Sequence, residues 1–250
     1  MSDKHSGTKF VIITSPRCGS TWLVSLLNQL KNTTTYGEMF LSRQRVENWD
    51  AGFAYPRFVE TYKARSFWRP GAVFEYLDTI YQQPGTVGFK LMYNHIKRTP
   101  ELLIYLLIHR IHVIHLVRKN TLNVLISRAV IHQTQQAHRL ASDPPIEGVQ
   151  IELDPRTLIK KLRAKQRRQN RTRRFLRWSG LRLHEVAYED LQSDPAVFQS
   201  MCDFLSIKTD GIMPASKFQR MRRDRQSVVL KNYGEVRQAL EQTDFQVYLE

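Results

Sequence analysis

The chain has 250 residues, 42% of them hydrophobic, and this size allows one large domain or two small ones with a sizeable core. It carries 38 lysines and arginines against 23 aspartates and glutamates, a formal net charge of +15. This excess favours anionic partners, whether phosphorylated cofactors, acidic glycans, anionic lipid surfaces or nucleic acid, but does not choose among them.

Other features disfavour a membrane-spanning, secreted or metal-binding protein. The longest apolar run, LLIYLLI at 102–108, is far shorter than the roughly 18 residues of a membrane span, and the polar start MSDKHSGTKF has no signal-peptide core. Cys18 and Cys202 lie far apart and have neither metal-binding nor redox spacing. We therefore expect reduced thiols, a cytoplasmic location and no transmembrane segment.

Four short apolar stretches rich in β-branched residues predict strands at 10–14, 87–92, 112–117 and 183–188. The longer segments between them have helical periodicity. Strands that alternate with helices indicate an α/β protein, in three α/β/α layers around a central parallel sheet, and the near-continuous apolar character of the strands suits burial on both faces. We expect a single domain over residues 1–250.

Three further segments have distinctive compositions. Residues 48–72 are rich in aromatic side chains without a clean period, which suits an insertion or a lid around a pocket. Residues 141–155 contain Pro144-Pro145 and form the best candidate for a linker. Residues 156–178 predict a long basic helix that ends near Ser179-Gly180.

The first predicted strand leads into SPRCGST at 15–21 and then into a helix, an arrangement that binds anions through backbone N–H groups and the helix dipole. Gly19 allows close approach of the backbone, and Arg17 adds a fixed positive charge. The lysine and the first glycine of the nucleotide-triphosphate loop G-x-x-x-x-G-K-[ST] are absent, which disfavours hydrolysis of ATP or GTP. The alternative is an ordinary turn before a helix.

Four segments in order resemble the sulfotransferases that use 3′-phosphoadenosine 5′-phosphosulfate (PAPS). SPRCGSTWL at 15–23 resembles their 5′-phosphosulfate loop, and HVIHLVRKNTLNVLISR at 112–128 resembles their 3′-phosphate segment. YEDLQSDPAVFQSMCDFLSI at 188–207 resembles the family's Tyr-Glu-Asp strand end and the following helix. The tail at 228–249 is similar to that of the bacterial carbohydrate branch, which includes Nod-factor and trehalose sulfotransferases.

This resemblance implies a P-loop NTPase-like sulfotransferase fold and assigns roles at the donor site. Arg17 would hold the 5′-phosphate and the bridging oxygen, and Trp22 and Tyr188 would lie near the adenine. Arg118 and Ser127 would bind the 3′-phosphate, with help from RMRRDR at 220–225. The remaining residues of the phosphate cradle would be Cys18, Gly19, Ser20 and Thr21. No metal is expected, because side chains and amides neutralise a singly charged sulfuryl group.

The acceptor hydroxyl must lose a proton, so a general base is needed within hydrogen-bond reach. The resemblance to the Gly-Glu stretch of bacterial sulfotransferases implies that Glu38 is this base, with His95 as the alternative. Lys90, at the end of an apolar strand, would contact the sulfuryl oxygens or the acceptor. His112 and His115 would point to opposite faces of a strand, which disfavours a zinc site.

The leading reading is therefore transfer of a sulfuryl group from PAPS to a hydroxyl of a small molecule, glycan, glycolipid or natural product. One alternative is a basic nucleic-acid-binding module built on residues 160–177, which is weakened by the single interleaved aromatic residue, Phe175. The other is a P-loop kinase, disfavoured by the missing lysine. We expect no nucleic-acid partner, and the sequence leaves a homodimer open.

Overall fold

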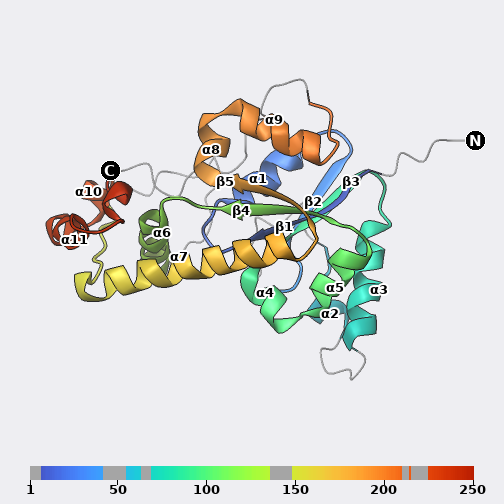
Figure 1. The fold of residues 1–250 in the computed structure, drawn as a ribbon, viewed down its shortest axis with the longest axis horizontal. Coiled ribbons are helices and arrows are strands. Elements are labelled where there is room, and N and C mark those ends of the chain that lie inside the picture. The colour runs from blue at the N-terminus through green and yellow to red at the C-terminus, as the bar shows by residue number, and fades with distance from the viewer. Residues whose placement is uncertain (1–6, 42–54, 63–68, 136–147, 210–213, 215–224) are drawn as a thin grey trace, which may run out of the picture. The chain divides into compact units, whose positions relative to one another are not determined.

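A computed structural model of the chain describes residues 7–41, 55–62, 69–135, 148–209, 214 and 225–250 (Figure 1). Much of the predicted lid at 48–72 and the first part of the predicted linker at 141–155 lie outside the described residues. So do all but the last residue of the basic segment at 220–225. Within the described residues, no helix combines the length and the apolar character needed to span a bilayer.

The centre of the fold is a five-stranded parallel sheet with strand order β2-β3-β1-β4-β5. Its strands are β1 (Lys9–Thr14), β2 (Thr33–Glu38), β3 (Thr86–Met92), β4 (His112–Val117) and β5 (Arg182–Ala187). The four strands predicted from apolar runs are confirmed. The edge strand β2, TTTYGE, lacks an apolar run, so the sequence analysis did not predict it.

Alternation along the strands produces a core on each face of the sheet. Val11 and Ile13 of β1 face one apolar cluster, and Phe10 and Ile12 face the other. The first cluster is covered by α2 (Phe58–Thr61), α3 (Arg69–Tyr81), α4 (Tyr93–Arg98), α5 (Glu101–Ile108) and the C-terminal end of α7 (Pro155–Trp178). The second is covered by α1 (Ser20–Leu27), α8 (Tyr188–Ser193) and α9 (Pro195–Phe204). The predicted three-layer α/β/α arrangement is confirmed (Figure 1).

The chain divides into two compact units, of which the first holds the sheet and comprises residues 1–117 and 173–216. The second comprises residues 118–172 and 217–250. Its helices are α6 (Thr121–Thr134), most of α7, α10 (Gln226–Val229), α11 (Tyr233–Leu240) and the 3₁₀ turn η2 (Gln246–Tyr248). These elements pack around their own apolar cluster, which includes Leu122, Leu158, Leu162 and Val236.

Helix α7 has a clear start and a clear end in the sequence. Asp154 precedes it, and its carboxylate accepts the backbone N–H of Arg156 at 3.0 Å, as an N-cap residue does. Pro155 occupies the first helical position, where its missing N–H costs nothing. Gly180 has a φ of 74°, a left-handed conformation that ends helices and that glycine adopts without strain. The predicted end near Ser179-Gly180 is confirmed.

Candidate active site

The loop between β1 and α1 has the backbone geometry of an anion-binding loop. Thr14, the last residue of β1, donates its hydroxyl to the carbonyl of Leu116 in β4 at 2.8 Å, which fixes the start of the loop. Arg17 and Gly19 have φ values of 71° and 80°, both in the left-handed region. Left-handed residues in such a loop turn backbone N–H groups toward a common point in front of the following helix.

Gly19 is required at its position for two reasons. Its positive φ is one that L residues adopt only with strain. In addition, a Cβ placed on it would lie 2.1 Å from Cδ2 of Tyr188, so the tyrosine ring packs directly against the loop backbone. Trp22 meets the same ring edge-to-face, with centroids 5.5 Å apart, and Gln192 donates to the Tyr188 hydroxyl at 2.7 Å. The structure therefore brings three of the predicted donor-site residues together.

A buried lysine connects this loop to a carboxylate. Lys90 in β3 is 1% exposed, and its ammonium donates to the Thr21 hydroxyl at 3.4 Å. The same Nζ lies 3.2 Å from Oε1 of Glu38 at the end of β2. The β2–β3 register shifts between Tyr36 and Glu38, so that Glu38 lies opposite Lys90. Such irregularities re-aim side chains, and here the result is an ion pair beside the loop.

His95 completes this group from the opposite side of the carboxylate. It lies in α4, directly after β3, and its Nε2 is 3.9 Å from Oε2 of Glu38. Its Nδ1 accepts the backbone N–H of Met92 at 3.3 Å, so the proton of the neutral ring is on Nε2. Burial lowers the pKa of His95, while the Glu38 carboxylate opposes this change. Of the three side chains, only Glu38 is substantially accessible, with 25% of its side chain exposed.

The residues predicted to bind the 3′-phosphate belong to the second unit. Arg118 directly follows β4 and precedes α6, whose N-cap residue Asn120 accepts the backbone N–H of Asn123 at 3.0 Å. Ser127 lies further along α6. Both residues are partly exposed, and Nε of Arg118 is buried.

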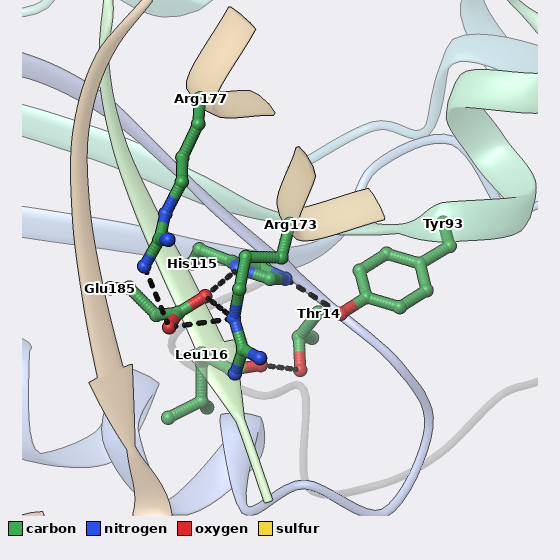
Figure 2. Close-up of polar contacts among 7 residues, drawn as sticks. All are labelled: Thr14, Tyr93, His115, Leu116, Arg173, Arg177 and Glu185. Carbon is green, nitrogen blue, oxygen red and sulfur yellow. Dashed lines mark hydrogen bonds and ion pairs between the residues drawn. The ribbon is translucent and has the colours of Figure 1, made fainter. Parts of the chain in front are cut away.

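Sequence reasoning missed a polar network centred on the buried His115 of β4 (Figure 2). His115 is fully buried and lies opposite Glu185 of β5 in the parallel register. Its Nδ1 is 2.8 Å from a Glu185 oxygen, and its Nε2 is 2.7 Å from the Tyr93 hydroxyl. Arg173 of α7 donates to both Glu185 oxygens, at 2.7 and 2.9 Å, and a nitrogen of Arg177 lies 3.9 Å from the same carboxylate.

Each hydrogen bond of this network can be assigned one donor and one acceptor. Because a carboxylate only accepts, Nδ1 of His115 donates to Glu185, and with its one proton there a neutral ring would accept the Tyr93 hydroxyl at Nε2. Burial raises the pKa of Glu185, but hydrogen bonds from His115 and Arg173 outweigh it and lower the pKa to about 2. Tyr93 is the first residue of α4, the helix that carries His95. The network therefore ties the start of this helix to the sheet.

A signal for this network was present in the sequence. The strands HVIHLV and LHEVAY each carry polar residues within an apolar run. A charged or titratable residue inside a buried strand needs a partner, and His115 and Glu185 are partners across two adjacent strands. We considered His115 only as a zinc ligand, because nothing in the sequence reports which strands are neighbours.

Comparison with known proteins identifies the family. The model of the sulfotransferase domain family matches residues 7–243. A search of curated proteins gives no match. Among solved structures, similar chains include mouse sulfotransferase SULT7A1 complexed with PAP, which has 12% identity and a TM-score of 0.43. That match covers 81% of this chain and 59% of the mouse chain, so the protein spans less than two thirds of the length of this relative.

Two other similar structures are closer in size. A sulfotransferase from Alicyclobacillus acidocaldarius has 15% identity and a TM-score of 0.49, with 87% of each chain covered. The sulfotransferase domain from the curacin biosynthetic pathway has 17% identity and a TM-score of 0.45, with 98% of each chain covered. Because all three TM-scores are below 0.5, the assignment rests on the family model. That model extends over nearly the whole sequence, and the chain belongs to the sulfotransferase domain family.

Proposed function

We propose that this sulfotransferase transfers a sulfuryl group from PAPS to a hydroxyl of an acceptor, as in the bacterial carbohydrate branch that its C-terminal tail resembles. The observation that carries the proposal is the contact series from Thr21 in the loop, through buried Lys90, to Glu38. This series connects an anion-binding loop to a carboxylate, and the loop lacks the lysine that nucleoside-triphosphate loops carry. Sulfuryl transfer requires both parts, a loop that binds the donor phosphate and a base that accepts the proton of the acceptor hydroxyl.

The residues of the loop fit the phosphosulfate end of PAPS. Gly19 gives a cradle that a Cβ would fill, and the buried hydroxyls of Ser20 and Thr21 lie at the start of α1. Arg17 contributes positive charge that no change of pH in the working range removes. When bound, PAPS supplies a singly charged sulfuryl group on a phosphate oxygen, and this oxygen takes the bonding electrons on transfer. Arg17 and the loop amides would stabilise that charge.

Lys90 is suited to an electrostatic role at the reacting centre. Its ammonium lies between the Thr21 hydroxyl and the Glu38 carboxylate, in a position closed to water. A preorganised charge in such a place stabilises developing negative charge more strongly than it would in solvent. Lys90 would contact the sulfuryl oxygens during transfer.

Glu38 is the better candidate for the base. It is the accessible carboxylate of the group, and a carboxylate can accept the acceptor's proton as the new oxygen–sulfur bond forms. His95 presents Nε2–H toward Glu38, because its other nitrogen already accepts the amide of Met92. In this tautomer the nitrogen facing the site donates and cannot accept a proton. His95 would therefore orient Glu38.

The same proposal includes the second unit. The family model runs from residue 7 to residue 243 and so includes parts of both units, which supports a single sulfotransferase domain over the chain. We assign Arg118 and Ser127 to the 3′-phosphate, as the resemblance implies, and Trp22 and Tyr188 to the adenine. Cys18 and Cys202 are both free and buried, which supports a reducing, cytoplasmic setting.

Ligand-dependent thermal stabilisation tests the donor. The wild-type chain should be stabilised by 3′-phosphoadenosine 5′-phosphate (PAP) at micromolar concentration, and much less by ATP or by a short oligonucleotide. Preference for ATP would favour a kinase, and preference for the oligonucleotide would favour a nucleic-acid-binding module. Incubation with labelled PAPS and a panel of hydroxylated glycans, glycolipids and small molecules would then identify the acceptor class.

A further inference from the structure

Helix α7 carries a straight row of positive charge opposite its buried side. At 100° per residue, Leu158, Leu162 and Leu176 point to one side of the helix, and all three are buried. The opposite side presents an exposed row that recurs every three or four residues. Its members are Arg156, Lys160, Arg163, Arg167, Arg171 and Arg174. The row is about 27 Å long, and the helix contains no aspartate or glutamate to interrupt it.

The row ends in aromatic residues. Trp178 follows Arg174 at helical spacing on the same side of α7, and 89% of its surface is exposed. Phe175, one position further round the helix, is 48% exposed. Folded proteins rarely leave a tryptophan this exposed without a use for it, because burying one is among the larger single gains in apolar contact.

We propose that the outer side of α7, from Arg156 to Trp178, docks on an anionic membrane surface. The straight row of six cations can meet a plane of anionic headgroups along its whole length. A lipid surface also accepts the apolar rings of Phe175 and Trp178 at the end of the row, as it does those of other interfacial helices. A second copy of this chain would bring its own row of like charge to the contact, in a protein with a net charge of +15.

Docking requires no rearrangement of the helix. The apolar side of α7 stays in the protein core, and the exposed row adds attraction to lipid headgroups. Each basic residue near an anionic surface contributes about a fivefold gain in binding. Such attraction weakens with salt, since these charges are exposed. The apolar residues then contribute a part of the binding that salt does not remove.

Flotation of the full-length protein with vesicles tests this proposal. We compare vesicles of phosphatidylcholine alone with vesicles of phosphatidylcholine mixed with phosphatidylglycerol. The row variant is Arg163→Glu/Arg167→Glu/Arg171→Glu. The matched control reverses three exposed lysines elsewhere, Lys31→Glu/Lys208→Glu/Lys231→Glu, and changes the net charge equally. A third variant, Phe175→Ser/Trp178→Ser, tests the apolar part, and circular dichroism verifies that each variant is folded.

The wild-type protein should bind the anionic vesicles and not the neutral ones. The row variant should bind at least about a hundredfold more weakly, the control less than about tenfold more weakly, and the apolar variant about fivefold more weakly. Equal losses in the row and control variants, or no preference for anionic vesicles, would overturn the proposal. So would tighter binding to a duplex oligonucleotide that the row variant loses, or self-association that the apolar variant abolishes without any vesicle binding.

Discussion

Replacement of Glu185 by glutamine tests how much the buried network contributes to stability. The substitution keeps the shape of the side chain and an acceptor for His115, but it removes the charge that pairs with Arg173. The pKa of Glu185 is lowered from 4.5 to about 2, and this difference corresponds to about 3 kcal/mol of stabilisation of the folded state. Because 21% of the side chain remains exposed and solvent screens the charge, we expect a loss of about 1–2 kcal/mol at pH 7.

The pH dependence makes this prediction specific. A carboxylate whose pKa is lower in the folded state stabilises the fold above pH 4.5, and this contribution is lost as the pH falls toward 2. The difference in the free energy of unfolding between wild type and Glu185→Gln should therefore be largest at pH 7 and fall by about half by pH 3. Urea unfolding at both pH values measures it.

A matched control uses an exposed ion pair. Glu241 pairs with Arg237 one turn away at 2.8 Å, with both side chains largely exposed. Glu241→Gln should cost less than about 0.5 kcal/mol at either pH. If Glu185→Gln cost no more than this control, or if its cost were the same at pH 7 and pH 3, then the network would not stabilise the fold through an ionised Glu185.

Three further predictions concern the proposed active site. Glu38→Gln should retain PAP binding but lower turnover by about 10²–10⁴, whereas His95→Asn should lower it less; the reverse order in steady-state rates would make His95 the base. Arg118→Ala should weaken binding of PAP by about 1.5–3 kcal/mol and leave binding of adenosine 5′-phosphosulfate nearly unchanged, and equal losses by calorimetry would reject its 3′-phosphate role. Gly19→Ala, at a φ of 80° and with its Cβ 2.1 Å from Tyr188, should weaken PAP binding at least tenfold; unchanged affinity would show that the loop adapts to the methyl group.

The main features of the fold could be predicted because they depend on local patterns. Apolar β-branched runs identified four strands, and the composition of residues 156–178 identified the long helix together with its end. Strand β2 was missed because its sequence, TTTYGE, contains no apolar run. It lies at the edge of the sheet, where a strand need not be apolar throughout. Predicting β2 would have required knowledge that this segment pairs with strand β3.

The site was predictable as a set of residues but not as a geometry. Glu38 and Lys90 were each predicted as site residues. Their ion pair, however, depends on a register shift between β2 and β3 that cannot be recognised in the sequence. The tautomer of His95 depends on the amide of Met92, and so on the exact turn between β3 and α4. Contacts of this kind are set by tertiary packing, which acts on residues far apart in the chain.

The hydrogen bonds of buried His115 affect how the protein tolerates substitution at this place. Exchange of His115 alone for an apolar residue would remove the contact that the Tyr93 hydroxyl makes with Nε2 and one of the two donors to a Glu185 oxygen, at a cost of about 1–3 kcal/mol. If Tyr93 became phenylalanine and Glu185 became apolar at the same time, the three side chains would carry no polar group in need of a partner, and Arg173 could turn to water. Substitutions at Tyr93, His115 and Glu185 should therefore be accepted together and rejected one at a time, so that these three positions evolve as a set.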